Sequence, residues 1–340
     1  MKKLRLGIVG AGRIGRVHAR TVSNCPNAAP IAITDINRAA AEEVAQLYGF
    51  SRVAEDSRQI FESSDIDAVL ICSATNTHAQ MITQAAAGGK HIFCEKPIDY
   101  DLSRIDSALD SVERAGVKLQ VGFNRRFDAN FTRVRKAIES GEIGTPHLMH
   151  IISRDPAPPP ISYIKVSGGM FFDMTIHDFD MARFLMGEVD EIYAAAGVMV
   201  NPEIGEAGDL DTAVITLKFK SGAIGTIDNS RQAVYGYDQR VEVLGSKGSI
   251  ATGNCFPNQA VVSTSTEVHR DLPLNFFMER YAESFATELQ AFISAIAEDK
   301  EPRVTGLDGR MPVLMGMAAN KSYKEGRPVH LHEVGTKTTV

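Results

Sequence analysis

The sequence predicts an α/β protein: an N-terminal Rossmann domain with a doubly wound parallel sheet, then an α+β domain with a large, mostly antiparallel open sheet. Up to about residue 122, short apolar segments alternate with helical segments, which is typical of parallel strands covered on both faces. From about residue 189 onward, strand-like segments follow one another through short turns, which favours antiparallel pairing. A length of 340 residues also exceeds one ordinary hydrophobic core. We therefore expect two domains, residues 1–122 and residues 123–340.

Composition places the chain among globular proteins and excludes several classes of function. Apolar residues make up 44% and charged residues 23%, and the formal net charge of −6 argues against a nucleic-acid partner. The sequence has no run of about 18 apolar residues to span a membrane, and its first residues read as a strand rather than a signal peptide. We expect a cytoplasmic protein without a metal site, because the cysteines lack metal-ligand spacing and read as reduced thiols: Cys25, Cys72, Cys94 and Cys255.

A glycine-rich loop follows the first predicted strand, residues 4–9, and precedes a helical segment that ends near Asn24. In the pattern G-x-G-x-x-G the first glycine allows a tight turn, the second lets the backbone approach a pyrophosphate, and the third allows close helix–strand packing. The helix N-terminus then presents N–H groups to the phosphates. The candidate dinucleotide-binding residues are Gly10, Gly12, Arg13, Ile14 and Gly15.

An acidic residue, Asp35, ends the second predicted strand (residues 30–34), twenty residues beyond Gly15. A carboxylate at this place accepts the hydroxyls of the adenine ribose and repels a 2′-phosphate. We therefore expect NAD as the cofactor, and NADP remains possible because Arg38 lies three residues further on. The alternative is an ordinary glycine turn with an exposed aspartate.

Strand and helix continue to alternate, with a helix at 38–48, a short strand near Val53, a helix near Gln59 and a strand at 67–72. A polar loop follows before the next helix, 79–87. Because ligands of doubly wound folds bind beyond the carboxyl ends of the strands, we assign this loop to the ribose and nicotinamide side of the cofactor. For its two central residues, helix capping is the alternative. The loop residues are Ser73, Ala74, Thr75, Asn76 and His78.

The next predicted strand, residues 91–94, runs directly into Glu95-Lys96-Pro97. A proline stops the strand and fixes the turn, so the amine of Lys96 is expected to face the cofactor and the substrate. Glu95 is expected to lie at the cofactor site as a positioning group. A helix at 102–115 and a strand at 118–121 complete the first domain.

Two adjacent arginines, Arg125 and Arg126, open the second domain. Because buried arginines are costly without partners, they either bind carboxylates between domains or reach substrate and cofactor. A helix at 129–140 and a strand at 147–154 follow, and then the stiff proline-rich loop 156–160. Such a loop suits a pocket wall or a subunit contact.

A second polar centre contains Asp173 and His177, which follow a Gly-Gly turn. On one helix, residues four apart share a face, so the carboxylate and the imidazole are expected to be neighbours. Asp178 and Asp180 point elsewhere by the same geometry and are expected to be surface or capping acids. The alternative for His177 is a purely structural role.

The remainder predicts strands at 192–200, 212–219, 223–230, 240–244 and 249–252, and helices at 280–298 and 309–324. Tyr235, between two strands, either places its phenol in the pocket or packs in the core. A sheet covered by helices on one face leaves its other face available for oligomerisation.

Four motifs together resemble the glucose–fructose oxidoreductase/inositol dehydrogenase/MocA family over essentially the full length: residues 10–15, residues 95–97, Gly122-Phe123-x-Arg125-Arg126-Phe127-Asp128, and Asp173-x-x-x-His177. Residues 153–160 and 173–183 look like the inositol 2-dehydrogenase branch. The resemblance implies a homotetrameric, NAD-dependent oxidoreductase that oxidises a cyclic polyol, foremost myo-inositol to its 2-keto product. Alternatives are scyllo-inositol or another sugar, NAD-assisted glycoside hydrolysis, and a non-catalytic cofactor sensor.

The resemblance also implies the roles of individual residues. Lys96, Asp173 and His177 carry the family's catalytic group. From the chemistry we expect His177 to serve as the base, since imidazole has an ordinary pKa of about 6.5, and Asp173 to hold its tautomer. Lys96 is expected to donate to the substrate oxygen, and a relay of the proton through Lys96 is the alternative. The positions that match polyol contacts in inositol dehydrogenases are Lys96, Arg125, Ser153, Asp155, Asp173, His177 and Tyr235.

Overall fold

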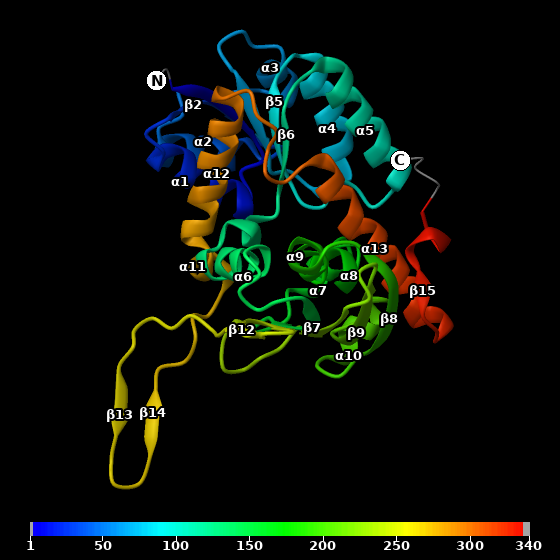
Figure 1. Ribbon diagram of the computed structural model, residues 1–340. Coiled ribbons are helices and arrows are strands. Elements are labelled where there is room, and N and C mark those ends of the chain that lie inside the picture. The colour runs from blue at the N-terminus through cyan, green and yellow to red at the C-terminus, as the bar shows by residue number, and fades with distance from the viewer. Residues whose placement is uncertain (1–2, 336–340) are drawn as a thin grey trace. The chain divides into compact units, whose positions relative to one another are not determined.

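The computed structural model describes residues 3–335. The described chain forms two compact units, one containing residues 3–127 and 283–313, the other containing residues 128–282 and 314–335. Figure 1 labels many of their helices and strands. In the described residues no helix has the length and apolar character that crossing a membrane requires.

The first unit contains a parallel sheet with the strand order β3-β2-β1-β4-β5-β6, so the predicted doubly wound Rossmann sheet is confirmed. The order reverses between β1 and β4, which makes the loops after these two strands neighbours at the carboxyl edge. The strands are β1 (Leu4–Val9), β2 (Ala28–Thr34), β3 (Arg52–Val53), β4 (Ala68–Ile71), β5 (His91–Glu95) and β6 (Leu119–Gly122).

Helices connect these strands, as the alternating sequence pattern predicts. One boundary differs, because α4 begins at Thr75 rather than at residue 79. Its N-cap is Ala74, which provides no side-chain cap, so capping does not explain Thr75 and Asn76. The helices are α1 (Arg13–Asn24), α2 (Arg38–Tyr48), α3 (Ser57–Phe61), α4 (Thr75–Ala87) and α5 (Leu102–Ala115), followed by the 3₁₀ turn η1 (Asn124–Phe127).

A helix from late in the chain, α12 (Ala282–Ala297), completes the core of the first unit. Its apolar residues Leu289 and Phe292 pack in the same cluster as Leu6 and Ile8 of β1, and Figure 1 shows α12 beside α1. The expected single division at residue 122 therefore differs from the structure, which returns residues 283–313 to the first unit. The sequence does not predict that residues 283–313 pack in the first unit. The apolar face of a helix shows that the helix is packed against something, but not which element it contacts.

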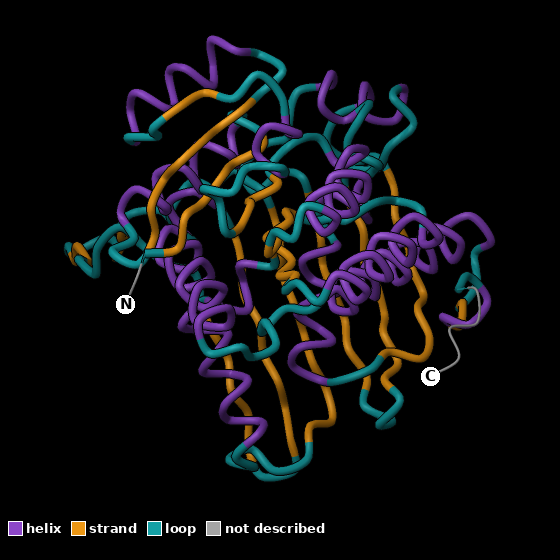
Figure 2. Tube along the Cα trace, turned by 90° about the horizontal axis from the view of Figure 1, so that it is seen from above, coloured by secondary structure: helices purple, strands orange, loops and turns teal. Residues whose placement is uncertain are grey.

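The second unit is built on a sheet with the strand order β12-β11-β7-β10-β9-β8-β15, and the predicted mostly antiparallel sheet is confirmed. Only the β7–β10 pairing among its described pairs is parallel. Figure 2 draws the strands in orange, and neighbouring strands of this sheet run alongside one another. The strands are β7 (Pro146–Arg154), β8 (Val189–Gly197), β9 (Thr212–Phe219), β10 (Ile224–Ser230), β11 (Asp238–Gly245), β12 (Gly248–Thr252) and β15 (Val329–His330).

Helices of the second unit pack on one face of this sheet, where α9 contacts β7 and α6 contacts β12. Its helical elements are α6 (Ala129–Glu139), α7 (Ile161–Ile164), α8 (Met170–Asp173), α9 (Ile176–Met186), α10 (Pro202–Glu206), α11 (Phe277–Arg280) and the later part of α13 (Gly306–Glu325), with the 3₁₀ turn η2 (Leu331–Glu333).

A hairpin in the second unit, β13 (Val261–Ser263) with β14 (Val268–Arg270), is absent from the sequence-based prediction. Residues 257–272 are all exposed. The alternation of buried and exposed side chains that reveals a strand is therefore missing here.

Candidate functional site

The glycine loop lies against the loop that follows β4. Gly10 has a φ of +109°, and a Cβ atom built on it would lie 2.5 Å from the carbonyl oxygen of Cys72. A Cβ atom on Gly15 would lie 2.1 Å from the carbonyl oxygen of Gly10, so this glycine lets α1 approach the loop. Both glycines are therefore required by contacts within the chain.

Gly12 differs from both, because a Cβ atom built on it would meet no described protein atom within 4 Å. Its φ of −70° suits any residue, and it is the N-cap of α1 without a side-chain cap bond. The space over Gly12 and the N–H groups at the start of α1 fit a dinucleotide pyrophosphate. Arg13 is exposed and Ile14 is half-buried at the same end of the helix.

The contrast between two glycines gives a matched test of this loop. Gly15→Ala is expected to cost about 3 kcal/mol in the free energy of unfolding, because the methyl group would collide with backbone. Gly12→Ala is expected to change that free energy by less than about 0.5 kcal/mol while weakening NAD binding about tenfold or more. Urea unfolding and NADH fluorescence titration measure the two quantities, and an unfolded Gly12→Ala protein would contradict this assignment.

Asp35 follows β2 and reaches the glycine loop. Its carboxylate accepts hydrogen bonds from the backbone N–H of Ala11 at 2.6 Å and of Asn37 at 2.8 Å. Further lone pairs on these oxygens can accept ribose hydroxyls. Arg38, which kept NADP possible, pairs with Glu42 one helical turn away at 2.8 Å.

The loop after β4 is tied together by its own side chains. The hydroxyls of Ser73 and Thr77 lie 2.7 Å apart, and Ala74, Thr75 and Asn76 are exposed or half-buried above them. These residues remain available at the carboxyl edge of the sheet.

His78 is buried, in contrast to its expected place facing the cofactor. Its Nδ1 lies 2.8 Å from the carbonyl oxygen of Pro97, and its Nε2 lies 3.0 Å from that of Ser73. Burial lowers the pKa of this imidazole, since desolvation disfavours its charged form. His78 therefore links the loop after β4 to the turn that contains Lys96.

The Glu95-Lys96-Pro97 turn ends β5, and its two charged side chains have different environments. Glu95 is buried, and its Oε1 lies 2.6 Å from Nε2 of His18 on α1. Lys96 is half-buried, and the Lys96–Pro97 peptide bond is cis. The structure thus gives Glu95 a positioning contact inside the first unit.

The two arginines after β6 are both buried in η1. Nη2 of Arg126 lies 3.0 Å from Oδ1 of Asp308 on α13. Both residues of this pair belong to the first unit, so this ion pair is not the expected one between domains. The roles of Arg125 and Arg126 stay predictions.

Asp173 lies at the end of α8 and is held by two donors. The hydroxyl of Tyr163 donates to Oδ1 at 2.7 Å, and Nη1 of Arg231 donates to Oδ2 at 3.2 Å. Met174 and Thr175 form a turn between α8 and α9, so the premise of one continuous helix is wrong. The pairing of Asp173 with His177 stays a prediction.

The expectation that Asp178 and Asp180 are surface or capping acids is wrong, because both are buried. Oδ2 of Asp178 accepts a hydrogen bond of 2.9 Å from the amide of Asn229 on β10. Asn229 also accepts from the hydroxyl of Thr175 at 2.6 Å and donates to the carbonyl oxygen of Ser153 at 3.2 Å. Helical spacing did not reveal this contact, since the polar partner comes from a distant strand.

Tyr235 lies in an ion-pair network at the ends of β7 and β11. Its hydroxyl donates to Asp238 at 2.6 Å and accepts from Arg154 at 3.1 Å. Arg154 follows Ser153 in the strand, so their side chains leave opposite faces of the sheet. The structure therefore does not bring the Tyr235 hydroxyl together with the Ser153 side chain. Asp155 is half-buried and follows directly after β7.

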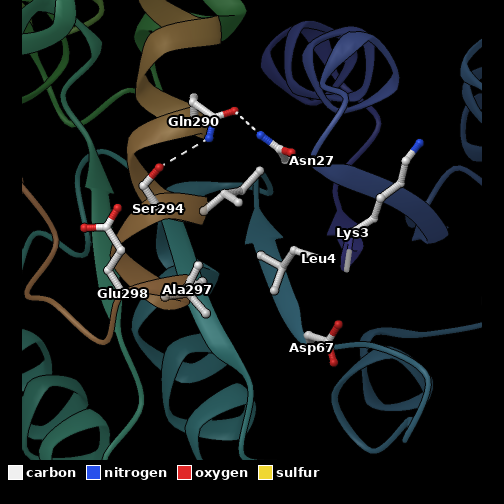
Figure 3. Close-up of a pocket in the computed structure, with 10 residues that line it drawn as sticks. Lys3, Leu4, Asn27, Asp67, Gln290, Ser294, Ala297 and Glu298 are labelled. Atoms are coloured by element: carbon white, nitrogen blue, oxygen red, sulfur yellow. Dashed lines mark hydrogen bonds between the residues drawn. The ribbon is translucent and has the colours of Figure 1, made fainter. Parts of the chain in front are cut away.

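A hollow of about 310 Å³ in the first unit lies away from these residues (Figure 3). Leu4 and Asn27 border it at the amino ends of β1 and β2, opposite the glycine loop, and Gln290 of α12 binds Asn27 at 3.1 Å. We assign this hollow no part in the chemistry.

Within residues 3–335 no group of His, Cys, Asp or Glu is arranged to hold a metal ion. The four cysteines form no disulfide. Burial raises the pKa of the thiols of Cys72 and Cys94, which keeps them protonated and unreactive.

Comparison with known proteins decides the family. The model of an oxidoreductase family with an NAD-binding Rossmann fold matches residues 4–123, and the model of the GFO/IDH/MocA C-terminal domain matches residues 131–251. The chain belongs to the GFO/IDH/MocA oxidoreductase family. Membership confirms the predictions of an oxidoreductase and of NAD as its cofactor.

Relatives within the family match the chain from end to end. Myo-inositol 2-dehydrogenase of Thermotoga maritima is 48% identical over 332 residues, which is 97% of this chain and 99% of that protein. Inositol 2-dehydrogenase of Rhizobium meliloti is 47% identical over 329 residues, covering 96% and 99%. Scyllo-inositol dehydrogenase from Lactobacillus casei, solved with NAD(H) and scyllo-inositol, has a TM-score of 0.91 at 30% identity, covering 97% and 100%.

Proposed function

We propose that this enzyme oxidises myo-inositol at C2 to 2-keto-myo-inositol with NAD as the hydride acceptor. The observation that carries the proposal is 48% identity over 97% of the chain to a myo-inositol 2-dehydrogenase. Two relatives named for scyllo-inositol are less identical, at 37% and 30%, than the myo-inositol 2-dehydrogenase at 48%, which favours the myo isomer over the scyllo isomer.

We assign cofactor binding to the first unit. The open space over Gly12, the start of α1 and the carboxylate of Asp35 fit the pyrophosphate and ribose of NAD. When bound, NAD supplies the acceptor for the hydride that leaves the alcohol carbon. The chain itself must therefore remove the hydroxyl proton and stabilise the charge on oxygen.

Three residues divide this work in the proposed mechanism. His177 takes the hydroxyl proton as a general base, and Asp173 stabilises the imidazolium that results. Lys96 donates a hydrogen bond to the substrate oxygen as its charge develops. Arg125, Ser153 and Asp155 are the proposed contacts to the other polyol hydroxyls.

A substrate screen tests the proposed function directly. The purified protein is incubated with NAD or NADP and with each inositol isomer or simple sugar, and NADH formation is followed by absorbance. We expect the largest kcat/KM for myo-inositol with NAD. A preference for another polyol would contradict the substrate assignment, and turnover of a glycoside without net NADH would favour hydrolysis.

The outer face of the second unit's sheet supports a homo-oligomer, proposed to be a tetramer. Leu148 on β7 lies directly between Ile224 on β10 and Leu244 on β11, and all three are exposed. Val214 on β9 extends the exposed apolar surface. Exposed apolar patches of this kind mark contacts between protein surfaces.

Charge on this outer face is expected to dissociate the oligomer. The double variant Val214→Glu/Ile224→Glu places two carboxylates in the proposed contact, where burial without partners is unfavourable. Light scattering is expected to show four times the 36.9 kDa chain mass for the wild type and a smaller mass for the variant. Val268→Glu on the exposed hairpin is the control, and a tetramer that tolerates both carboxylates would contradict this interface.

A further inference from the structure

Asp173 receives a hydrogen bond on each of its carboxylate oxygens from side chains outside its own helix. Tyr163 donates to Oδ1 at 2.7 Å and Arg231 donates to Oδ2 at 3.2 Å. Two donors from different directions fix both the position and the rotation of a carboxylate, and charge-assisted hydrogen bonds of this kind are the strong ones.

Arg231 is itself immobilised, because its guanidinium reaches three separate acceptors. Nη1 binds Asp173, Nη2 binds Asp209 at 3.1 Å, and Nε donates to the carbonyl oxygen of Leu210 at 3.3 Å. The side chain of Arg231 is 1% exposed. Asp209 also accepts from the backbone N–H of Met170, the first residue of α8, at 2.8 Å. Arg231 and Asp209 thus hold both ends of the helix that carries Asp173.

The strand β10 supplies a second anchor two residues before Arg231. Asn229 binds Thr175 at 2.6 Å and Asp178 at 2.9 Å, and these residues flank His177 on either side. Asn229 is completely buried. Residues 229–231 therefore hold the chain on both sides of the turn between α8 and α9, with Arg231 bound to Asp173 and Asn229 bound to Thr175 and Asp178.

Tyr163 approaches Asp173 differently, since it belongs to α7 at the end of the proline-rich loop. The residue is 46% exposed, whereas Arg231 is buried. Removing the Tyr163 hydroxyl therefore perturbs the contact to Asp173 without opening a cavity in the core.

We propose that Tyr163 and Arg231 are positioning residues for Asp173, and that Asn229 positions the helix carrying His177. Holding the Asp173 carboxylate in one rotamer keeps its negative charge in place to stabilise the His177 imidazolium that forms when the proton is removed. The inference rests on the proposed function for the role of Asp173, but the contacts to Asp173 are testable without turnover.

The Tyr163→Phe variant is the first test. We expect kcat for the polyol to fall about tenfold, since one hydrogen bond to a charged group corresponds to about a tenfold rate difference. The KM for NAD and the midpoint of thermal unfolding are expected to stay at wild-type values. Tyr323→Phe, which removes a hydroxyl from another exposed tyrosine, is the control. A wild-type kcat, or a loss confined to KM, would overturn the role of Tyr163.

A double-mutant cycle identifies the residue through which Tyr163 acts. If the hydroxyl works through Asp173, adding Tyr163→Phe to Asp173→Asn leaves the residual kcat unchanged. A further tenfold loss in the double variant would show an independent effect and overturn the proposal.

Arg231 requires a conservative variant, because removal of this buried guanidinium leaves the two half-buried carboxylates of Asp173 and Asp209 without its charge and can prevent folding. Arg231→Lys keeps the charge but not the three-way contact, and we expect a loss in kcat of about tenfold or more. We expect Arg231→Lys to have a higher kcat than Arg231→Met, because the lysine keeps the positive charge beside Asp173. Equal kcat values in the two folded variants would overturn the assignment.

An unfolding cycle tests the contact even if the wild type oxidises no polyol. Urea unfolding of Arg231→Lys, Asp173→Asn and the double variant is expected to show a coupling of about fivefold or more in the unfolding equilibrium constant. Additive effects would overturn the positioning contact. Absence of polyol oxidation in the wild type would instead overturn the proposed function and leave this coupling measurable.

Discussion

The His177→Ala protein is expected to lose about 10²–10⁴-fold in kcat, because a general base contributes a factor of that size. The alcohol proton then has no side-chain acceptor as the hydride departs. Lys96→Ala is expected to fall by a similar factor, since the amine would no longer stabilise the developing charge on oxygen. Steady-state rates measured from pH 6 to about pH 10, a range that brackets the ordinary imidazole pKa of about 6.5, separate these roles.

Binding of NADH provides the control for the His177→Ala variant. His177 is not proposed to contact the cofactor, so fluorescence titration is expected to give a nearly unchanged affinity for NADH. Turnover of His177→Ala close to wild type would sink its assignment as the base. Equal loss of NADH binding and turnover would indicate misfolding rather than a catalytic defect.

The Asp35→Ser protein is expected to lose most of its preference for NAD. Hydrogen bonds to a charged group contribute about 1.5–3 kcal/mol, so kcat/KM with NAD should fall about 10–100-fold. Activity with NADP should rise at the same time, because the carboxylate that repels a 2′-phosphate is gone. The ratio of kcat/KM values for the two cofactors measures the change.

Asp35 also accepts the backbone N–H of Ala11 at 2.6 Å, so its removal loosens the glycine loop. Asp35→Asn is the matched control, since an amide oxygen can still accept that N–H while the negative charge is lost. Glu42→Ala removes the carboxylate that pairs with Arg38 at 2.8 Å. The ratio of kcat/KM values for the two cofactors then tests whether the released Arg38 favours NADP. An unchanged cofactor ratio in Asp35→Ser would contradict the assigned recognition of the ribose.

The cofactor loop could be predicted from the sequence because its physical requirements are local. Gly10 and Gly15 are needed by backbone within a few residues or by the neighbouring strand, and the strand–loop–helix order places them at the carboxyl edge. Lys96 was also predictable as a strand-end residue. Its cofactor-facing orientation remains a proposal.

The surroundings of Asp173 could not be predicted in the same way. Arg231 lies 58 positions further along the chain, and no pattern in the sequence links the two. Asp178 was misassigned because helical spacing describes a single helix, whereas its partner Asn229 comes from β10. Long-range contacts between polar side chains have no periodicity to reveal them.

Transfer of an isotopic label from substrate to cofactor tests the central claim most directly. Myo-inositol carrying deuterium at C2 is incubated with the enzyme and unlabelled NAD, and the mass of the NADH is measured. The proposed oxidation at C2 predicts NADH that carries one deuterium, together with a ketone at that carbon. Unlabelled NADH would contradict oxidation at C2, and no NADH from myo-inositol would contradict the proposed reaction as a whole.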